Sequence, residues 1–137
     1  MKLLFLCTGN SCRSQMAEGL AKTILCKKYR IKNAGLEAHG INPYSVDTMK
    51  KIDIDISEQI SSIIDINRFK YFDLIITLCG DAKDRCPVFI KTEKHIHWDI
   101  EDPANFIGDK LKIKDKFSEI RDDIKDRVGK LAKELNI

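Results

Sequence analysis

Eight residues near the N-terminus combine a cysteine, an arginine and small polar side chains in a pattern suited to chemistry on an anion. The segment from Cys7 to Ser14 reads Cys-Thr-Gly-Asn-Ser-Cys-Arg-Ser, with Arg13 six positions after Cys7. An arginine offers a planar pair of donors that matches two oxygens of a tetrahedral oxyanion. A cysteine thiolate is a strong nucleophile. These residue types predict a nucleophilic thiol beside an oxyanion-binding loop, although a purely structural role for both side chains is the alternative.

The same loop can supply further donors to an anion. Gly9 and Asn10 tolerate positive φ, which lets successive backbone N–H groups point into one concavity. A helix predicted from Ser14 adds the partial positive charge of its N-terminus, and Ser14 can cap this helix or donate to the Cys7 sulfur. A thiol of pKa ~8.5 is only about 3% ionised at pH 7, and these surroundings favour the thiolate. The predicted oxyanion-binding residues are Thr8, Gly9, Asn10, Ser11, Cys12, Arg13 and Ser14.

Apolar periodicity predicts the elements that must position this loop. Short strands are expected at Lys2–Leu6, at Tyr29–Asn33 (ending before Gly35), at Leu74–Leu78 and at His95–Trp98. The almost wholly apolar third segment is typical of a strand buried on both faces of a parallel sheet.

Helical spacing separates and follows these strands. One helix is expected from Ser14, a second opens at Pro43, and a short one lies near Ile63–Phe69. A long amphipathic helix ends the chain, with one apolar stripe formed by Phe117, Ile120, Ile124, Val128, Leu131 and Leu135. Alternating strands and helices predict a single α/β domain spanning residues 1–137.

Composition excludes several classes of protein. The 137 residues are 43% hydrophobic and 33% charged, as in ordinary globular domains, and the formal net charge is only +3. Because the net charge is small, we expect no nucleic-acid partner. We also expect no membrane partner, since no apolar run approaches the ~18 residues of a spanning helix. Five cysteines cannot all pair within the chain. They indicate catalytic or redox thiols in a cytoplasmic protein rather than a disulfide framework.

Several motifs together resemble the arsenate reductases built on the low-molecular-weight protein tyrosine phosphatase fold, and the resemblance covers nearly the whole chain. It implies a four-stranded parallel sheet flanked by helices, with arsenate as the substrate and no cofactor. The motifs that carry it are Cys7–Ser14, Gln15–Gly19, Ala34-Gly35, His39-Gly40, Asn42-Pro43, Leu78–Asp81, Cys86-Pro87, Trp98 and Asp102–Ala104.

The resemblance also implies a role for each catalytic residue. Cys7 attacks arsenate, held by Arg13, while Asp102 protonates the departing oxygen. Cys79 then attacks the Cys7 sulfur and releases arsenite, and Cys86 carries the disulfide outward to a Cys79–Cys86 bond. Thioredoxin reduces that bond, and we expect the enzyme to work as a monomer with a weak phosphatase side activity.

Four other interpretations of these residues stay open from the sequence. The chain could be a low-molecular-weight tyrosine phosphatase with incidental extra cysteines, or a regulatory domain that binds oxyanions without reacting. Cys79 and Cys86 could also form a zinc site with His95 and His97, although Cys-x6-Cys is not typical zinc spacing. Both thiols could instead simply pack as small apolar residues.

The remaining predictions concern support of the site. Seven helical steps would separate Cys79 and Cys86 by about 10.5 Å, beyond the ~4.4–6.8 Å of a disulfide, so the Gly80–Arg85 segment is predicted to move on oxidation, with Gly80 as its hinge. Some relatives hold potassium near the loop. Asn10 and Glu18 are present here, but Asn33 and Ser62 stand where a Ser and an Asp are expected, so no metal is predicted. We expect Cys12, Cys26 and Trp98 to be packing residues, with a Cys7–Cys12 disulfide as the alternative for Cys12, and His39 to make a loop hydrogen bond.

Overall fold

A parallel β-sheet forms the centre of the protein. The computed structural model describes residues 1–25, 27–78 and 95–135. Its sheet has four strands in the order β2-β1-β3-β4, and every neighbouring pair is parallel. The predicted four-stranded parallel sheet is therefore confirmed. The strands are β1 (Lys2–Cys7), β2 (Arg30–Gly35), β3 (Leu74–Thr77) and β4 (His95–His97).

The central strand β1 is buried along nearly its whole length. Leu3 to Leu6 are at most 1% exposed, as expected for a strand covered on both faces. Its partner β2 runs two residues further than the sequence suggested, because Gly35 still pairs with Cys7. A side chain at Gly35 would stand 2.7 Å from the Asn10 Cβ and from the Glu37 carbonyl oxygen. Glycine therefore allows the strand to approach the loop closely.

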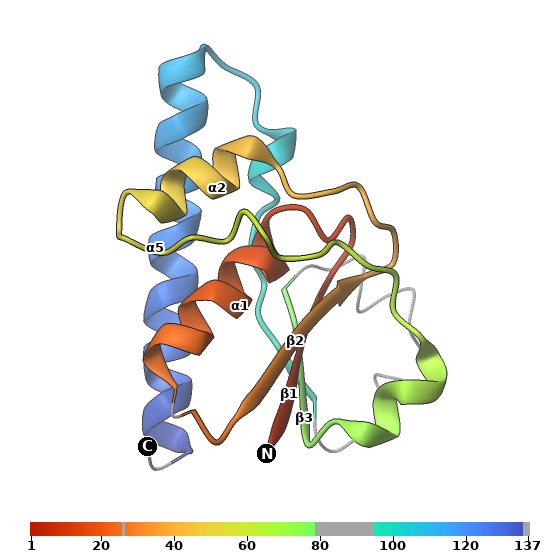
Figure 1. The fold of residues 1–137 in the computed structure, drawn as a ribbon. Helices are drawn as coiled ribbons and strands as arrows, with labels where there is room; N and C mark the ends of the chain where they lie inside the picture. Colours follow the sequence, from red (N-terminus) through yellow and green to blue (C-terminus); the bar gives the residue numbers. More distant parts are fainter. Residues whose placement is uncertain (26, 79–94, 136–137) are drawn as a thin grey trace.

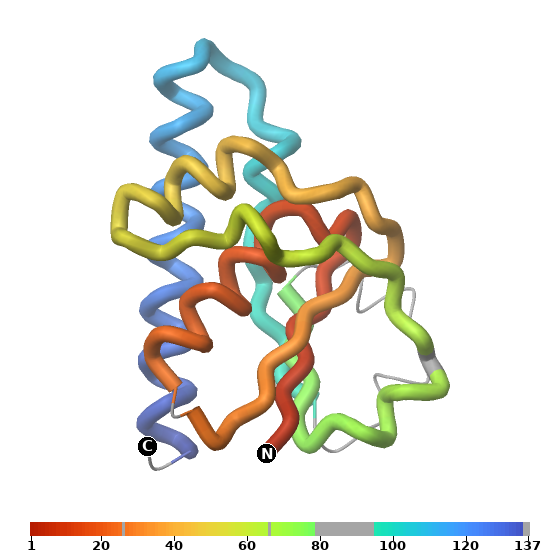
Figure 2. Tube along the Cα trace, in the orientation of Figure 1, coloured from red at the N-terminus to blue at the C-terminus, as the bar shows by residue number. Residues whose placement is uncertain are grey.

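Helices cover this sheet in two tiers. Helix α1 packs on β1 and β2, and the long helix α5 packs against α1 and α2 (Figure 1). The tube in Figure 2 shows α5 running along most of the height of the molecule. The helices are α1 (Arg13–Ile24), α2 (Pro43–Lys50) and α5 (Lys110–Glu134), with short 3-10 turns η1 (Ile66–Tyr71) and η2 (Pro103–Asn105).

The apolar stripe predicted for the last helix forms the core contact of α5. Its members from Phe117 to Leu131 are buried, and Leu135 is partly buried. Trp98 is also a core residue, 6.0 Å from the ring centre of Phe5. In the described part of the chain, no helix is both long enough and apolar enough to span a bilayer.

Helix beginnings agree with the sequence in one case and differ in another. Pro43 opens α2 as predicted, and the Asn42 side chain accepts a hydrogen bond from the Tyr44 backbone N–H. The predicted capping of α1 by Ser14 is wrong. Helix α1 begins one residue earlier, at Arg13, with Cys12 at the capping position and no side-chain cap. Ser14 lies inside the first turn, which leaves its hydroxyl available to the loop that follows β1.

The short helix expected near Ile63–Phe69 lies later in the chain and is a tighter 3-10 turn. It spans Ile66–Tyr71, with the Asp65 carboxylate accepting from the Asn67 backbone N–H at its start. Ile63 instead forms an isolated parallel bridge with Gly35. The chain before η1 is thus tied to the end of β2, beside the loop that follows β1.

Candidate active site

A small cavity lies where the carboxyl ends of the parallel strands meet. The loop after β1 forms its base, and the connections that follow β2 and β4 reach it from elsewhere in the chain (Figure 1). Crevices beyond the carboxyl ends of strands are the usual ligand sites of such sheets. The cavity measures about 180 Å3 and is lined by Cys7, Thr8, Gly9, Ser11, Cys12, Arg13, His39, Asp102, Ala104 and Asn105.

Cys7 ends β1 and is 1% exposed. Its sulfur lies 2.9 Å from the Ser14 hydroxyl oxygen, which itself accepts a hydrogen bond from the Asn10 side-chain amide at 2.7 Å. Because this oxygen already accepts, the Ser14 proton is available to the sulfur. A hydroxyl donor and the N-terminus of α1 both favour a thiolate at this position.

Asn10 holds the loop in a left-handed turn, with φ of +50° and no exposed surface. Its side-chain amide nitrogen also donates to the Asn33 side-chain Oδ1 at 2.6 Å, and its own side-chain Oδ1 accepts from the Ser62 backbone N–H at 2.7 Å. The Gln15 side chain donates to the Asn10 backbone oxygen at 3.0 Å. The loop is thus bound to α1, to β2 and to the segment before η1.

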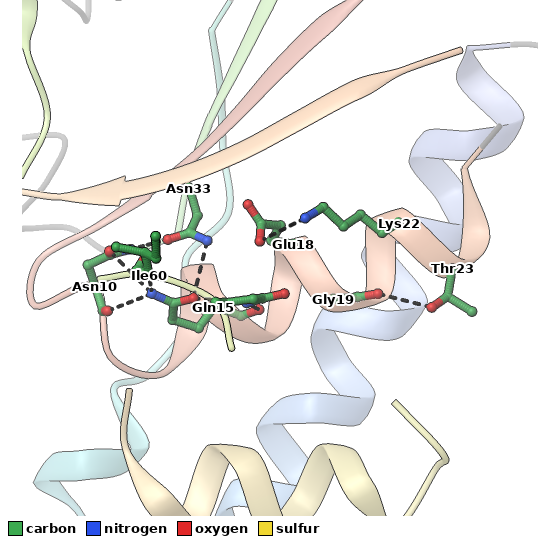
Figure 3. A network of polar contacts seen from close by, with 9 residues as sticks. Asn10, Gln15, Glu18, Gly19, Lys22, Thr23, Asn33 and Ile60 are labelled. Carbon is green, nitrogen blue, oxygen red and sulfur yellow. Dashed lines mark hydrogen bonds and ion pairs between the residues drawn. The ribbon is translucent and has the colours of Figure 1, made fainter. Parts of the chain in front are cut away.

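Amide side chains complete this network, as Figure 3 shows for Asn10, Gln15 and Asn33. The Gln15 side-chain Oε1 accepts from the Asn33 side-chain amide at 3.2 Å and from the Gln59 side-chain amide at 2.9 Å. Glu18 pairs instead with Lys22, at 3.2 Å. Among residues 1–25, 27–78 and 95–135, no three His, Cys, Asp or Glu side chains gather as a metal site would require.

The Arg13 guanidinium is 6% exposed and is held from two sides. One terminal nitrogen donates to the Ile100 carbonyl oxygen at 3.0 Å, and the other lies 3.4 Å from an Asp102 carboxylate oxygen. Its Nε is buried and has no hydrogen-bond partner among the described residues. A buried donor without a partner is costly and calls for a specific explanation, such as a catalytic role or a bound ion. Arg13 therefore has a donor left for an anion in the cavity.

Asp102 reaches the cavity from the connection after β4. One carboxylate oxygen accepts from the Ala104 backbone N–H at 3.0 Å and begins η2, while the other faces Arg13. The side chain is 28% exposed. It is therefore fixed at one oxygen and open to solvent, as a proton donor to a leaving group has to be.

Cys12 also lines the cavity, but its surroundings differ from those of Cys7. Burial raises the pKa of the Cys12 thiol to about 11, against the lowering effect of the Ser11 and Ser45 hydroxyls, and the charges of Asp102 and Cys7 raise it further. At neutral pH the group is a protonated thiol. This agrees with a packing residue and not with a nucleophile.

Several predicted residues lie outside the described part of the chain. They are Cys26, Cys79, Cys86 and the Gly80–Arg85 segment, and with them the zinc alternative. Within the described part, His95 and His97 do share one strand face. The Thr77 hydroxyl oxygen lies 2.9 Å from the His95 Nε2 and 2.6 Å from the His97 Nδ1.

One charged residue beside the cavity escaped the sequence reasoning. The Glu37 Oε2 lies 2.7 Å from the Nε2 of His39, a residue that lines the cavity. An acidic residue two positions before a histidine was the signal available in the sequence, which predicts only a loop hydrogen bond for His39.

Comparisons with known proteins agree with this geometry. The family model described as low molecular weight phosphotyrosine protein phosphatase matches residues 2–137. A protein of Oceanobacillus iheyensis named arsenate reductase is 47% identical over 131 residues, which cover 96% of this chain and 94% of that protein.

Solved structures give the same result. A structure titled as an arsenate reductase in the phosphate binding state is 36% identical, covers 97% of each chain and superposes with a TM-score of 0.79. A serine mutant of the YwlE arginine phosphatase, with a phosphorylated active-site serine, is 25% identical, covers 99% of this chain and 96% of that one, and has a TM-score of 0.84. The chain therefore belongs to the low-molecular-weight phosphotyrosine protein phosphatase family.

Proposed function

We propose that the protein is a thioredoxin-coupled arsenate reductase. The observation that carries this proposal is the buried, unpartnered Nε of Arg13, a residue that lines the same cavity as Cys7. An arginine donor beside a candidate thiolate suits a tetrahedral oxyanion that is to be attacked. The 47% identical relative named arsenate reductase supports arsenate as that oxyanion.

In the proposed first step, the Cys7 thiolate bonds to the arsenic of arsenate. Arg13 and the backbone N–H groups of the loop hold the remaining oxygens, and Asp102 gives its proton to the oxygen that leaves as water. The ion pair between Arg13 and Asp102 joins the two groups that act on the substrate, at 3.4 Å. An incoming anion competes with the Asp102 carboxylate for the Arg13 guanidinium.

The proposed second step reduces arsenic. The Cys79 thiolate attacks the Cys7 sulfur, the sulfur–arsenic bond breaks, and its electron pair stays on arsenic, which leaves as arsenite. Two thiols thereby become one Cys7–Cys79 disulfide for each arsenate reduced. Cys86 then attacks Cys79, which returns Cys7 to the thiolate, and thioredoxin reduces the resulting Cys79–Cys86 bond. Because thioredoxin maintains reduced thiols in the cytoplasm, we expect the enzyme to act there. We also expect it to act as a monomer, since every residue in these steps belongs to one chain.

A tyrosine phosphatase is the second candidate function, and the phosphorylated serine in the YwlE mutant shows that a related scaffold accepts a phosphoryl group. The size of the cavity favours the first candidate. Its volume of about 180 Å3 is below the ~300 Å3 at which sites for drug-sized ligands begin. A free oxyanion with a few waters fits such a space.

A Cys79→Ser variant separates the two functions. We expect it to lose arsenate turnover with thioredoxin but to keep any hydrolysis of para-nitrophenyl phosphate, since a phosphatase needs only one nucleophilic cysteine. Cys26→Ser is the matched control for the loss of one thiol and should behave as wild type. Thioredoxin-supported turnover in Cys79→Ser would contradict the proposal.

A thiol count on the wild-type protein tests the stoichiometry. One turnover with arsenate, without thioredoxin, should remove two thiols, and peptide mapping should find a Cys79–Cys86 disulfide. Binding of arsenate without any loss of thiols would instead support a regulatory oxyanion-binding domain. Replacing thioredoxin with glutathione and glutaredoxin in the assay tests the identity of the electron donor.

A further inference from the structure

Two residues beside the cavity have no role in the proposed reaction. Glu37 and His39 lie in the connection between β2 and α2, and their side chains meet at 2.7 Å. The His39 ring lines the same cavity as Cys7 and Arg13. Both side chains are about half exposed, so the pair stands at the solvent edge of the cavity and not in its floor.

The backbone positions Glu37 and His39 more firmly than the contact between their side chains does, because a polar contact at an exposed position contributes little to stability. The Glu37 backbone N–H donates to the Thr8 carbonyl oxygen at 2.8 Å, and that of His39 donates to the Gly9 carbonyl oxygen at 3.1 Å. The connection therefore runs alongside the loop as a continuation of the β1–β2 pairing, and both side chains take their positions from it.

Gly9 allows the His39 ring to lie directly against the loop. A Cβ added at Gly9 would stand 3.0 Å from the His39 Nδ1, so the ring occupies the space that a side chain would need. Gly40 follows with φ of +78°, a conformation that favours glycine, and the Asn42 backbone N–H then donates to the Ser11 carbonyl oxygen at 3.0 Å. The imidazole is thus held between Gly9 on one side and the Glu37 carboxylate on the other.

We propose that the Glu37–His39 pair is a specificity wall, which admits free inorganic oxyanions and disfavours phosphate esters of aromatic alcohols. This inference rests on the proposed function of the Cys7 loop. An ester carries a bulky group on one oxygen, and that group must leave the cavity past its edge. On the side of His39 it meets an imidazole and a carboxylate, whose desolvation by an apolar ring is unfavourable.

The rest of the cavity offers an aromatic group no compensation. Its lining on the described part of the chain contains no Phe, Tyr or Trp to stack against the leaving group. Ala104 and Asn105 close the edge that comes from η2. A free oxyanion needs neither space nor apolar contact beyond the loop, so the Glu37–His39 pair does not weaken its binding. His39 is in this view a specificity residue, and Glu37 is a positioning residue that acts through it.

The test compares an aryl ester with arsenate on the same protein. We expect the Glu37→Ala/His39→Ala double variant to raise the ratio of kcat/KM for para-nitrophenyl phosphate to kcat/KM for arsenate by about tenfold, chiefly through a lower KM for the ester. The single variant Glu37→Gln keeps an acceptor for the imidazole, so its ratio of kcat/KM values should stay close to that of the wild type. Asp123→Ala removes another half-exposed carboxylate from an ion pair, with Arg127 on α5, and should change nothing.

Each other outcome overturns the proposal that the Glu37–His39 pair selects against aryl esters. An unchanged ratio in the double variant, with inorganic phosphate still binding, means that the pair does not select between esters and free ions. Loss of phosphate binding means that His39 belongs to the anion cradle itself. Because the ester assay requires no arsenate reduction, a wild-type protein that fails to reduce arsenate refutes the proposed function while KM for the ester still reports on the wall.

Discussion

At the scale of single residues, two thiols five positions apart differ in their chemistry because of their surroundings. Cys7 is next to the Ser14 hydroxyl at 2.9 Å and the start of α1, which favour its thiolate. Cys12 is just as buried, and burial raises the pKa of its thiol to about 11. Because both thiols are buried, the contact with the Ser14 hydroxyl is what distinguishes Cys7.

The raised pKa of Cys12 predicts a loss of stability in alkali. Between pH 9.0, its ordinary pKa, and about pH 11 the unfolded chain releases the thiol proton while the folded chain retains it. The unfolded state is therefore favoured as pH rises, and the free energy of unfolding falls by up to about 3 kcal/mol across this range. Urea unfolding of wild type and Cys12→Ala should give curves against pH that diverge above pH 9. Parallel curves would contradict the raised pKa.

Replacing Asp102 by Asn separates proton donation from structure. The amide oxygen still accepts from the Ala104 backbone N–H and preserves η2, but the acid is lost. We expect the single-turnover rate of thiol loss with arsenate to fall by about 100-fold or more. Inorganic phosphate should bind at least as tightly, since a carboxylate no longer faces Arg13 beside the anion. An unchanged rate would exclude Asp102 as the acid.

At the scale of elements, the loop after β1 depends on one strained residue and its hydrogen bonds. Asn10→Gly keeps the left-handed backbone but leaves buried partners such as the Ser62 N–H unpaired, which should lower the free energy of unfolding by about 1–3 kcal/mol. Asn10→Ala also forces an alanine into positive φ and should cost roughly 1–2 kcal/mol more. Urea unfolding measures both differences.

Asp53 provides the matched control, because it has φ of +61° at an exposed position outside the loop. Glycine and alanine at Asp53 should differ by the backbone contribution alone. Equal stabilities for Asn10→Gly and wild type would show that the amide network contributes nothing to the loop. Phosphate affinity of the same variants reports whether the network also holds the loop in its binding shape.

The elements themselves were largely predictable, because their signals are local. The apolar run after Met1, the stripe from Phe117 to Leu131 and the start of α2 at Pro43 follow from periodicity and capping alone. The errors lie where tertiary contacts decide. Helix α1 begins at Arg13 and not at Ser14, because the hydroxyl of Ser14 is used by Cys7 and Asn10.

The supporting contacts of the site could not be predicted in the same way. Gln15 and Gln59 are 44 residues apart in the sequence, and no local pattern at either position predicts their hydrogen bond. The pairing of Glu37 with His39 depends on the backbone ladder from the connection to Thr8 and Gly9. The motif Cys-x5-Arg indicates which residues bind the anion. The residues that fix its shape come from strands and turns that only the fold brings together.

At the scale of the whole molecule, the anion site joins segments from three parts of the chain. The loop base comes from β1 and α1, His39 follows β2, and Asp102 follows β4. Unfolding separates all three, so an anion that binds here binds only the folded protein. Its binding free energy should therefore appear as stability of the entire domain.

We accordingly predict that inorganic phosphate, at 100 times its dissociation constant, stabilises the wild-type protein by about 2.7 kcal/mol, which for a chain of 137 residues raises Tm by roughly 10 °C. Sodium chloride at equal ionic strength should not do so, because chloride cannot use the planar fork of Arg13. Arg13→Lys should lose most of the shift, since an ammonium group replaces the fork by a point charge. Calorimetric melts of both proteins in both salts measure this. Equal shifts in wild type and Arg13→Lys would mean that phosphate stabilises the fold elsewhere, and the cavity at the end of β1 would lose its claim as the anion site.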